Sequence, residues 1–220
     1  MRSACSIRGA AGRSASGFTL VELLVVLGII SVLATLAVVG FRGVNTALNV
    51  STATQAISAE LTNARQTALT LDETVQVRFY QYPDSSGASS TKEFQAMQMF
   101  QTKDNATFTP LDKISYLPAN IMISSNATFS PPLAPGNVTA KIPATSDPSI
   151  GLGGVGQNYT YVPINFKSNG TIDSTLFGSW YAGSWFITLY EKRYASATQL
   201  VNYATISIDP QDGRLRIFQP

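Results

Sequence analysis

The stretch SASGFTLVELLVVLGIISVLATLAVVGF, residues 14–41, decides how this chain folds. From Phe18 to Phe41 the residues are apolar or small, and Glu22 is the only charged one. As a helix rising ~1.5 Å per residue, this segment would be roughly 36 Å long, enough to cross a hydrocarbon core ~30 Å thick. A carboxylate at membrane depth costs ~2.5–3.5 kcal/mol on insertion scales, so Glu22 is expected to have a partner. Residues 18–41 therefore predict the membrane-spanning half of a long helix.

The residues before this segment set its orientation. Arg2, Arg8 and Arg13 precede Gly17 without any acidic residue. The N-terminus is therefore expected to stay in the cytoplasm, with the C-terminal part facing outward. A cleaved secretion signal would have a shorter apolar run followed by a small-x-small site. A plain signal anchor has the right length but leaves Glu22 unexplained.

The composition narrows the classes of function. The net charge of +2 comes from the arginines before Gly17, and no basic block indicates general affinity for nucleic acid. Cys5 is the only cysteine, and histidine is absent. A chain without residues 1–17 would therefore have no disulfide, no Cys or His zinc site and no Cys or His nucleophile. We expect no cofactor, no metal and no enzyme activity.

A second helical pattern follows the apolar run. Apolar or small residues recur at alternating spacings of four and three, which predicts a helix face packed on a core. The stripe consists of Ile57, Leu61, Ala64, Ala68 and Leu71, with Val44 and Leu48 extending it toward the N-terminus. Asp72 and Glu73 interrupt the pattern. Residues 42–72 therefore predict the amphipathic half of the long helix.

Residues 73–220 read as a β-rich domain. In TVQVRFYQY, residues 74–82, apolar Val75, Val77 and Phe79 alternate with Gln76, Arg78 and Tyr80, the pattern of a half-buried strand. Further strands are expected at residues 93–101, 113–117, 120–124, 159–167, 184–192, 203–209 and 214–218. Asn169-Gly170 predicts a hairpin turn, and residues 125–158 predict a long loop. Trp180, Tyr181 and Trp185 are expected to pack in the sheet.

The order of these elements predicts the fold class. A long helix followed by a β meander is an α+β arrangement, in which the second half of the helix packs against an antiparallel sheet. The string GLGGVG at residues 151–156 follows no strand and opens no helical pattern. It is therefore read as a loop and not as a dinucleotide-binding fingerprint.

The string GFTLVELLVVLGIISVLA, residues 17–34, resembles the class III signal of type IV prepilins and pseudopilins. The resemblance implies that a membrane-embedded prepilin peptidase cuts between Gly17 and Phe18, removing residues 1–17 as a leader. It also implies N-methylation of Phe18. Glu22 would be unpaired in the monomer and would face the amino terminus of a neighbouring subunit in the filament. Residues 18–45 contain no proline, unlike the helix of many major pilins.

Two C-terminal segments narrow the resemblance. INFKSNGTI and ISIDPQDGRLRIF are similar to pieces of the H-type minor pseudopilins of type II secretion and of FimT-like pilins. The segments ARQTALTLDETVQVRFYQY, EFQAMQMF and LPANIMISS resemble the D proteins of a four-gene pilin-like cassette in Verrucomicrobia, which implies no particular function.

The resemblance to minor pseudopilins implies a structural subunit that assembles into or primes a secretion pseudopilus or pilus-like filament. The implied partners are the prepilin peptidase, other pilin or pseudopilin subunits, the inner-membrane assembly platform and, before assembly, membrane lipid. The implied location is the bacterial inner membrane, with a single crossing, a cytoplasmic N-terminus and a periplasmic domain.

Two other classes of function remain open. GRLR, residues 213–216, would place Arg214 and Arg216 on one face of a strand, where they could grip phosphates. Some FimT-like pilins that serve DNA uptake carry such a stretch, but no wider basic patch supports nucleic acid as a partner here. A membrane-anchored enzyme is the third class, yet Asp209 and Asp212 lie in an expected turn without an acid–base context.

Overall fold

The structure is a computed structural model, and it divides the chain into two compact units, residues 1–43 and residues 44–220. The described residues are 17–82, 93–104, 106–134, 159–173, 185–194 and 200–219, with the side chains of residues 37–46 left out. Several predictions lie outside the described residues: the leader up to residue 16, the glycine string at 151–156, and Trp180 with Tyr181.

Helix α1 (Leu20–Leu71) ends where the sequence predicted. It stops because Asp72 adopts a left-handed backbone, with φ of 53°, which aspartate tolerates better than most residues. In the second unit, one face of α1 is buried through Val50, Ala53, Ile57, Leu61, Ala64 and Ala68. Three alanines on this face let the helix backbone approach the sheet closely.

The predicted stripe on this helix is confirmed at four positions and wrong at two. Ile57, Leu61, Ala64 and Ala68 are 0% exposed, whereas Leu48 is 59% and Leu71 42% exposed. Leu48 lies two residues before the buried Val50, which is more than half a helical turn away from the core-facing side. Leu71 is the last helical residue, at the point where the chain turns at Asp72.

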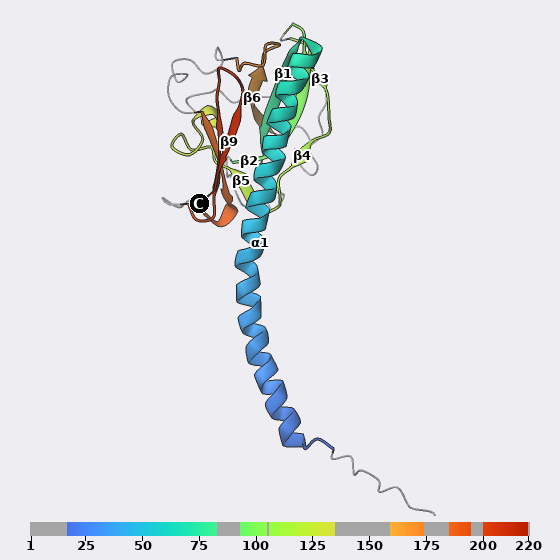
Figure 1. Cartoon of the computed structure of the whole chain (residues 1–220), viewed down its shortest axis with the longest axis vertical. Helices are drawn as coiled ribbons and strands as arrows, with labels where there is room; N and C mark the ends of the chain where they lie inside the picture. Colours follow the sequence, from blue (N-terminus) through green and yellow to red (C-terminus); the bar gives the residue numbers. More distant parts are fainter. Residues whose placement is uncertain are drawn as a thin grey trace, which may run out of the picture. The chain divides into compact units, whose positions relative to one another are not determined.

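The described strands of the second unit form one antiparallel sheet. They are β1 (Thr74–Gln81), β2 (Phe94–Thr102), β3 (Thr109–Pro110), β4 (Ser115–Tyr116), β5 (Ile121–Ile123), β6 (Thr160–Phe166), β7 (Phe186–Glu191), β8 (Ala204–Ile208) and β9 (Leu215–Phe218). Their order is β6-β1-β2-β5-β7-β8-β9, with β3 and β4 paired to β2 (Figure 1). The predicted α+β class with an antiparallel sheet is confirmed.

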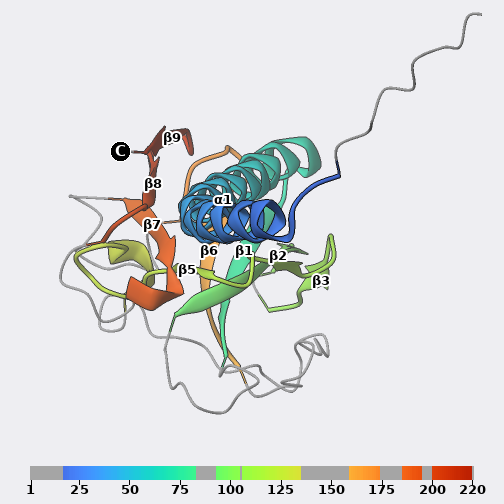
Figure 2. The same ribbon diagram turned by 90° about the horizontal axis from the view of Figure 1, so that it is seen from below.

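The predicted meander is wrong at one strand. β6 pairs with β1, with Val77 opposite Ile164, and so occupies the edge of the sheet beyond β1. Figure 2 shows β6 beside β1, and the strand order separates β6 from its sequence neighbour β7 by β1, β2 and β5. This pairing joins segments that are distant in the sequence, and strand periodicity carries no information about such partners.

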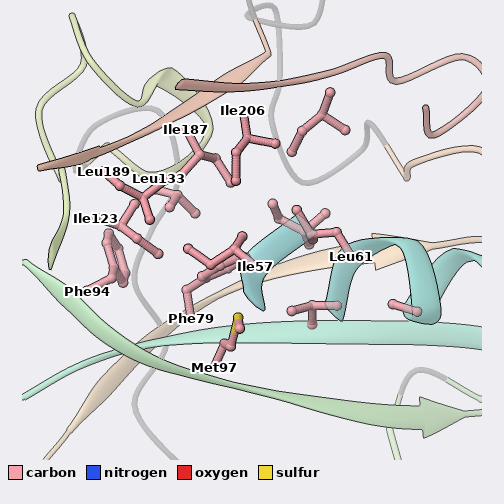
Figure 3. Packing of buried hydrophobic residues seen from close by; sticks show 14 of the residues in the cluster. Ile57, Leu61, Phe79, Phe94, Met97, Ile123, Leu133, Ile187, Leu189 and Ile206 are labelled. Atoms are coloured by element: carbon pink, nitrogen blue, oxygen red, sulfur yellow. The ribbon is translucent and has the colours of Figure 1, made fainter. Parts of the chain in front are cut away.

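The main core lies between the second half of α1 and the sheet. Figure 3 shows Ile57 and Leu61 from the helix pointing toward Phe79 and Met97 of β1 and β2. Residues from β5, β7 and β8 complete the cluster: Ile123, Ile187, Leu189 and Ile206. Trp185, 6% exposed, belongs to the same cluster, which confirms its expected packing. Burial of this apolar surface is the term that fixes the helix on the sheet.

Strand β1 is buried on both faces, which corrects the prediction of a half-buried strand. Its polar residues Gln76 and Arg78 are 1% and 0% exposed. The Arg78 guanidinium carbon lies 4.2 Å from the ring centre of Phe100 and 4.4 Å from that of Tyr161. Its Nε donates a hydrogen bond of 2.6 Å to the Gln76 side-chain oxygen. Aromatic rings thus cover the second face and stabilise the buried cation through cation–π contacts.

The start of the predicted loop at 125–158 is part of the core. A short 3₁₀ helix, η1 (Pro131–Leu133), buries Leu133 to 1% exposure. The Ser130 hydroxyl accepts a 3.0 Å hydrogen bond from the backbone N–H of Thr188 in β7. These residues of the predicted loop are therefore anchored, because apolar side chains and a buried hydroxyl tie them to the sheet. Residues 135–158 lie outside the described part.

Two turns of the sheet rest against the outer part of α1. Gly170, with φ of 79°, forms the predicted Asn169-Gly170 turn, and Gly213, with φ of 68°, closes the turn between β8 and β9. The Arg65 side chain donates a 2.6 Å hydrogen bond from its Nε to the backbone oxygen of Asp212. One helix residue thereby holds the last hairpin in place.

Candidate processing and assembly site

The predicted cleavage junction lies in open, non-helical chain. Gly17, Phe18 and Thr19 precede the first helical residue, Leu20, and Phe18 is 80% exposed. A Cβ atom added to Gly17 would meet nothing within 4 Å. A peptide bond in this position is accessible to a peptidase, because exposed and irregular backbone is where proteolysis concentrates.

Glu22 caps the helix that follows the junction. Its Oε2 accepts hydrogen bonds from the Thr19 backbone N–H at 3.3 Å and from the Thr19 hydroxyl at 3.2 Å. In return, the Glu22 backbone N–H donates to the Thr19 hydroxyl oxygen at 3.2 Å. This reciprocal arrangement is a capping box, with Thr19 as N-cap and Glu22 three residues later. A carboxylate in the first turn also interacts favourably with the helix dipole.

The capping box corrects the expectation that Glu22 is unpaired in the single chain. Thr19 is the residue that the sequence reasoning missed, although the pattern T-x-x-E ahead of an apolar run is its signature. Both residues follow the predicted cut, so removal of residues 1–17 leaves the box intact.

The helix beyond the box is apolar on all sides. Between residues 18 and 36, every large apolar side chain is at least 46% exposed. The hydroxyls of Ser31 and Thr35 donate to the helix's own carbonyl oxygens, at 2.8 and 2.7 Å. A helix that is apolar all round is normally covered by other helices or by lipid. Over the residues that the structure describes, no helix is both long and apolar enough to cross a membrane.

The family comparison decides the nature of this N-terminus. Residues 12–38 match the model of the prokaryotic N-terminal methylation motif. The chain carries a prokaryotic N-terminal methylation motif. The match confirms the predicted prepilin-type leader and covers both the junction and the capping box. No curated protein matches the chain in sequence.

Two solved structures align with about four fifths of the chain. The minor pseudopilin EpsH from the type 2 secretion system of Vibrio cholerae aligns with a TM-score of 0.40 and 7% identity, over 78% of this chain and 98% of that one. The type IV minor pilin FimU of Pseudomonas aeruginosa aligns with a TM-score of 0.41 and 12% identity, over 78% and 92%. Likenesses this distant support no inference about function.

The two arginines proposed for phosphate binding are not equivalent. β9 begins at Leu215, so Arg214 lies in the turn before the strand and Arg216 lies within it. The Arg214 Nε is 3.1 Å from Oδ2 of Asp212, whose Oδ1 accepts a 2.8 Å hydrogen bond from the Arg214 backbone N–H. The same aspartate therefore engages one arginine of the predicted pair, while both side chains remain at the surface.

A second charged feature lies away from the methylation motif. Burial, together with the hydrogen bond and the charge of the neighbouring Asp112 carboxyl group, raises the pKa of Glu60 on α1 from 4.5 to about 8. Asp112 is itself held in place, since its Oδ1 accepts a 2.9 Å hydrogen bond from the Met99 backbone N–H. No cluster of three metal-ligating side chains occurs among the described residues.

This carboxyl pair predicts that stability falls with rising pH. Between pH 4.5 and about 8 the folded chain keeps a proton on Glu60 that the unfolded chain has lost. The contribution is fully present below pH 4.5 and is lost by pH 8. After allowance for solvent screening, the loss should be on the order of 1–2 kcal/mol, or roughly 2–8 °C in Tm.

Thermal unfolding of the Glu60→Gln variant across this pH range checks the prediction, because the variant should lose the slope. Asp104→Asn is the matched control. Backbone N–H groups of Thr107 and Ala106 lower the pKa of Asp104 to about 2. Protonation of Asp104 therefore changes the stability only in strongly acidic solution. A slope that persists in Glu60→Gln would contradict the assignment.

Proposed function

We propose that this chain is a structural minor subunit of a type II secretion pseudopilus or a type IV pilus-like filament. The observation that carries the proposal is the methylation motif at residues 12–38. In this role, prepilin peptidase cuts between Gly17 and Phe18, and the new amino terminus of Phe18 is methylated. The product has no enzymatic step of its own.

The apolar helix supplies the driving force for the proposed assembly. Its exposed side chains need a cover, which lipid of the inner membrane provides first and the helices of other subunits provide in the filament. We place residues 18–41 in the membrane before assembly, with the N-terminus in the cytoplasm and residues 73–220 in the periplasm. The assembly platform would extract the subunit from there.

Glu22 changes partners in this scheme. In the single chain Thr19 satisfies one of its carboxylate oxygens through two long hydrogen bonds. Neutral hydroxyl and amide donors do not neutralise the charge, so a positively charged amino terminus on a neighbouring subunit remains the stronger partner in a low-dielectric helix bundle. The capping box thus gives Glu22 a resting partner that assembly can replace.

Glu22 variants test the proposal, because glutamine keeps the capping pattern and removes the charge. Glu22→Gln should be cleaved normally but should fall at least about tenfold in the sheared filament fraction, since a charge-assisted hydrogen bond is worth ~1.5–3 kcal/mol. Thr19→Ala, which removes the cap and keeps the charge, should lose far less. Quantitative immunoblots of membrane and filament fractions measure both. Wild-type assembly of Glu22→Gln would contradict the role of the charge.

DNA uptake is the weaker proposal. It would depend on Arg214 and Arg216, and Asp212 already engages the first of these. A single free arginine at the surface offers little of the phosphate neutralisation on which nucleic-acid affinity depends.

A further inference from the structure

The strand β9 is an open edge of the sheet. It is the last strand in the order and pairs with β8 alone among the described residues. Figure 2 shows β8 and β9 at one end of the row of strands, beyond β7. An open edge offers unpaired backbone donors and acceptors to another extended chain.

The hydrogen-bond pattern shows which backbone groups of β9 point outward. The Asp209 backbone N–H donates to the Arg214 carbonyl oxygen at 2.8 Å, so residues 209 and 214 form a hydrogen-bonded pair. Hydrogen-bonded and non-hydrogen-bonded pairs alternate along an antiparallel ladder. The backbone N–H and C=O groups of Arg216 and Phe218 therefore point toward β8. The N–H and C=O groups of Leu215 and Ile217 therefore face away from β8 and are available to a further strand.

The side chains around this edge differ between its two faces. On the face of the buried Ile206 and Ile208, Leu215 is only partly buried and Ile217 is 46% exposed. A surface pocket of about 90 Å³ adjoins this face, three times the ~30 Å³ share of one water. Its lining residues are Ala47, Val50, Asn202, Tyr203 and Gln219. The apolar face of the sheet thus continues past the part that α1 covers.

The opposite face of the edge carries the cation of Arg216. By strand alternation Arg214 and Phe218, which is 56% exposed, lie on the same face, and Asp209 stands opposite Arg214. No carboxylate among the described residues pairs with Arg216, and the Arg214–Asp212 pair is solvent-exposed, which makes it weak. A strand added beside β9 would therefore gain from acidic side chains on this face and from apolar ones on the other.

Pairing with a second copy of the chain brings like charges together in the register centred on Arg216. In the antiparallel register that joins Leu215 of one copy with Ile217 of the other, Arg216 stands directly opposite Arg216 of its partner. Like charges in such a non-hydrogen-bonded pair lie ~4.5 Å apart between Cα atoms and destabilise the pairing. A segment with a carboxylate at this position gains an ion pair instead, so the charge of Arg216 favours an acidic occupant.

We infer that the β9 edge, with the pocket beside it, binds an extended segment of another protein in which acidic and apolar residues alternate. The segment adds a strand to the sheet through the outward groups of Leu215 and Ile217. Its apolar side chains cover Ile217 and the pocket, and a carboxylate pairs with Arg216. This mode of recognition draws affinity from backbone hydrogen bonds and specificity from alternate side chains.

The test uses the full chain in detergent micelles and fluorescent short peptides of alternating glutamate and valine or lysine and valine. Fluorescence anisotropy should show the glutamate peptide binding at least about tenfold more tightly than the lysine peptide. Ile217→Pro removes one outward N–H without touching the β8 ladder and should weaken binding at least about tenfold. Arg216→Glu should reverse the preference between the peptides. Lys113→Glu, an equal charge change between β3 and β4, should alter neither.

Three results would overturn the inference. The first is binding that ignores peptide charge, and the second is binding that survives Ile217→Pro with unchanged affinity. The third is self-association of the wild-type chain, measured by sedimentation, that Ile217→Pro abolishes, which would assign the edge to a second copy. A circular-dichroism spectrum and Tm equal to those of the wild type establish that Arg216→Glu and Ile217→Pro are folded.

Discussion

A chain with Gly17→Val should keep its leader, whereas the wild-type chain should lose residues 1–17 in cells that contain prepilin peptidase. The reason lies in the peptidase and not in the fold. A Cβ at Gly17 meets nothing within 4 Å of the chain, so the substitution disturbs no internal contact. A side chain beside the scissile bond must instead fit the peptidase. The resemblance to prepilins implies that this peptidase cuts after a glycine. Intact-mass spectrometry of the purified protein measures the outcome directly.

Gly28→Val is the matched control for this experiment. Gly28 lies in the same helix-forming segment, and a Cβ there also meets nothing within 4 Å. The Gly28→Val chain should be cleaved completely, and its Phe18 should be methylated as expected for the wild type. Full cleavage of Gly17→Val would contradict the requirement for glycine before the cut. A native chain with Met1 still attached would contradict processing itself and with it the proposed assembly.

The sequence predicted what depends on local pattern. The end of α1 at Leu71, the strand beginning at Thr74 and the turn at Gly170 all follow from spacing, a helix breaker or a turn dipeptide. Each of these signals is contained within a few residues, so no knowledge of distant contacts is needed. The predicted cleavage junction at Gly17 also depends on a local pattern, and it lies within the matched methylation motif.

The features that the sequence did not predict depend on distant partners. Arg78 reads as a solvent-facing strand residue, yet rings from β2, from the segment ahead of β3 and from β6 enclose it. The placement of β6 beside β1 creates part of that enclosure, and the sequence of β1 does not predict this pairing. Propensity and alternation describe a strand's own preferences, and the covering layer decides whether its polar face meets water.

Thr19 is a different case, because its signal is local. Within the resemblance to a prepilin signal, Glu22 is the residue of the pattern T-x-x-E that has an implied role. The same four residues also satisfy the ordinary rule for beginning a helix. In the proposed scheme, one short motif therefore serves both helix initiation and assembly.

Gly213→Ala should be among the most destabilising single methyl additions in this domain. Gly213 has φ of 68°, where a Cβ costs ~1–2 kcal/mol. The added Cβ would also lie 2.5 Å from the backbone oxygen of Gly170 and 2.8 Å from Cδ of Arg65. A backbone oxygen cannot move aside as a side-chain end can, so overpacking adds to the strain. We expect a total loss of about 3–5 kcal/mol, or roughly 6–20 °C in Tm.

Gly170→Ala separates the two causes, because it has the same backbone strain without the backbone clash. Its φ is 79°, and its added Cβ would meet the end of the flexible Leu69 side chain at 3.2 Å. The expected loss is only about 1–2 kcal/mol, or roughly 2–8 °C, measured for both variants by thermal unfolding with the fluorescence of the buried Trp185. Equal losses at the two glycines would mean that the last hairpin does not lie against Arg65 and Gly170 as described. A larger loss at Gly213 means that this contact, made between two turns and the helix, holds β8 and β9 on the sheet.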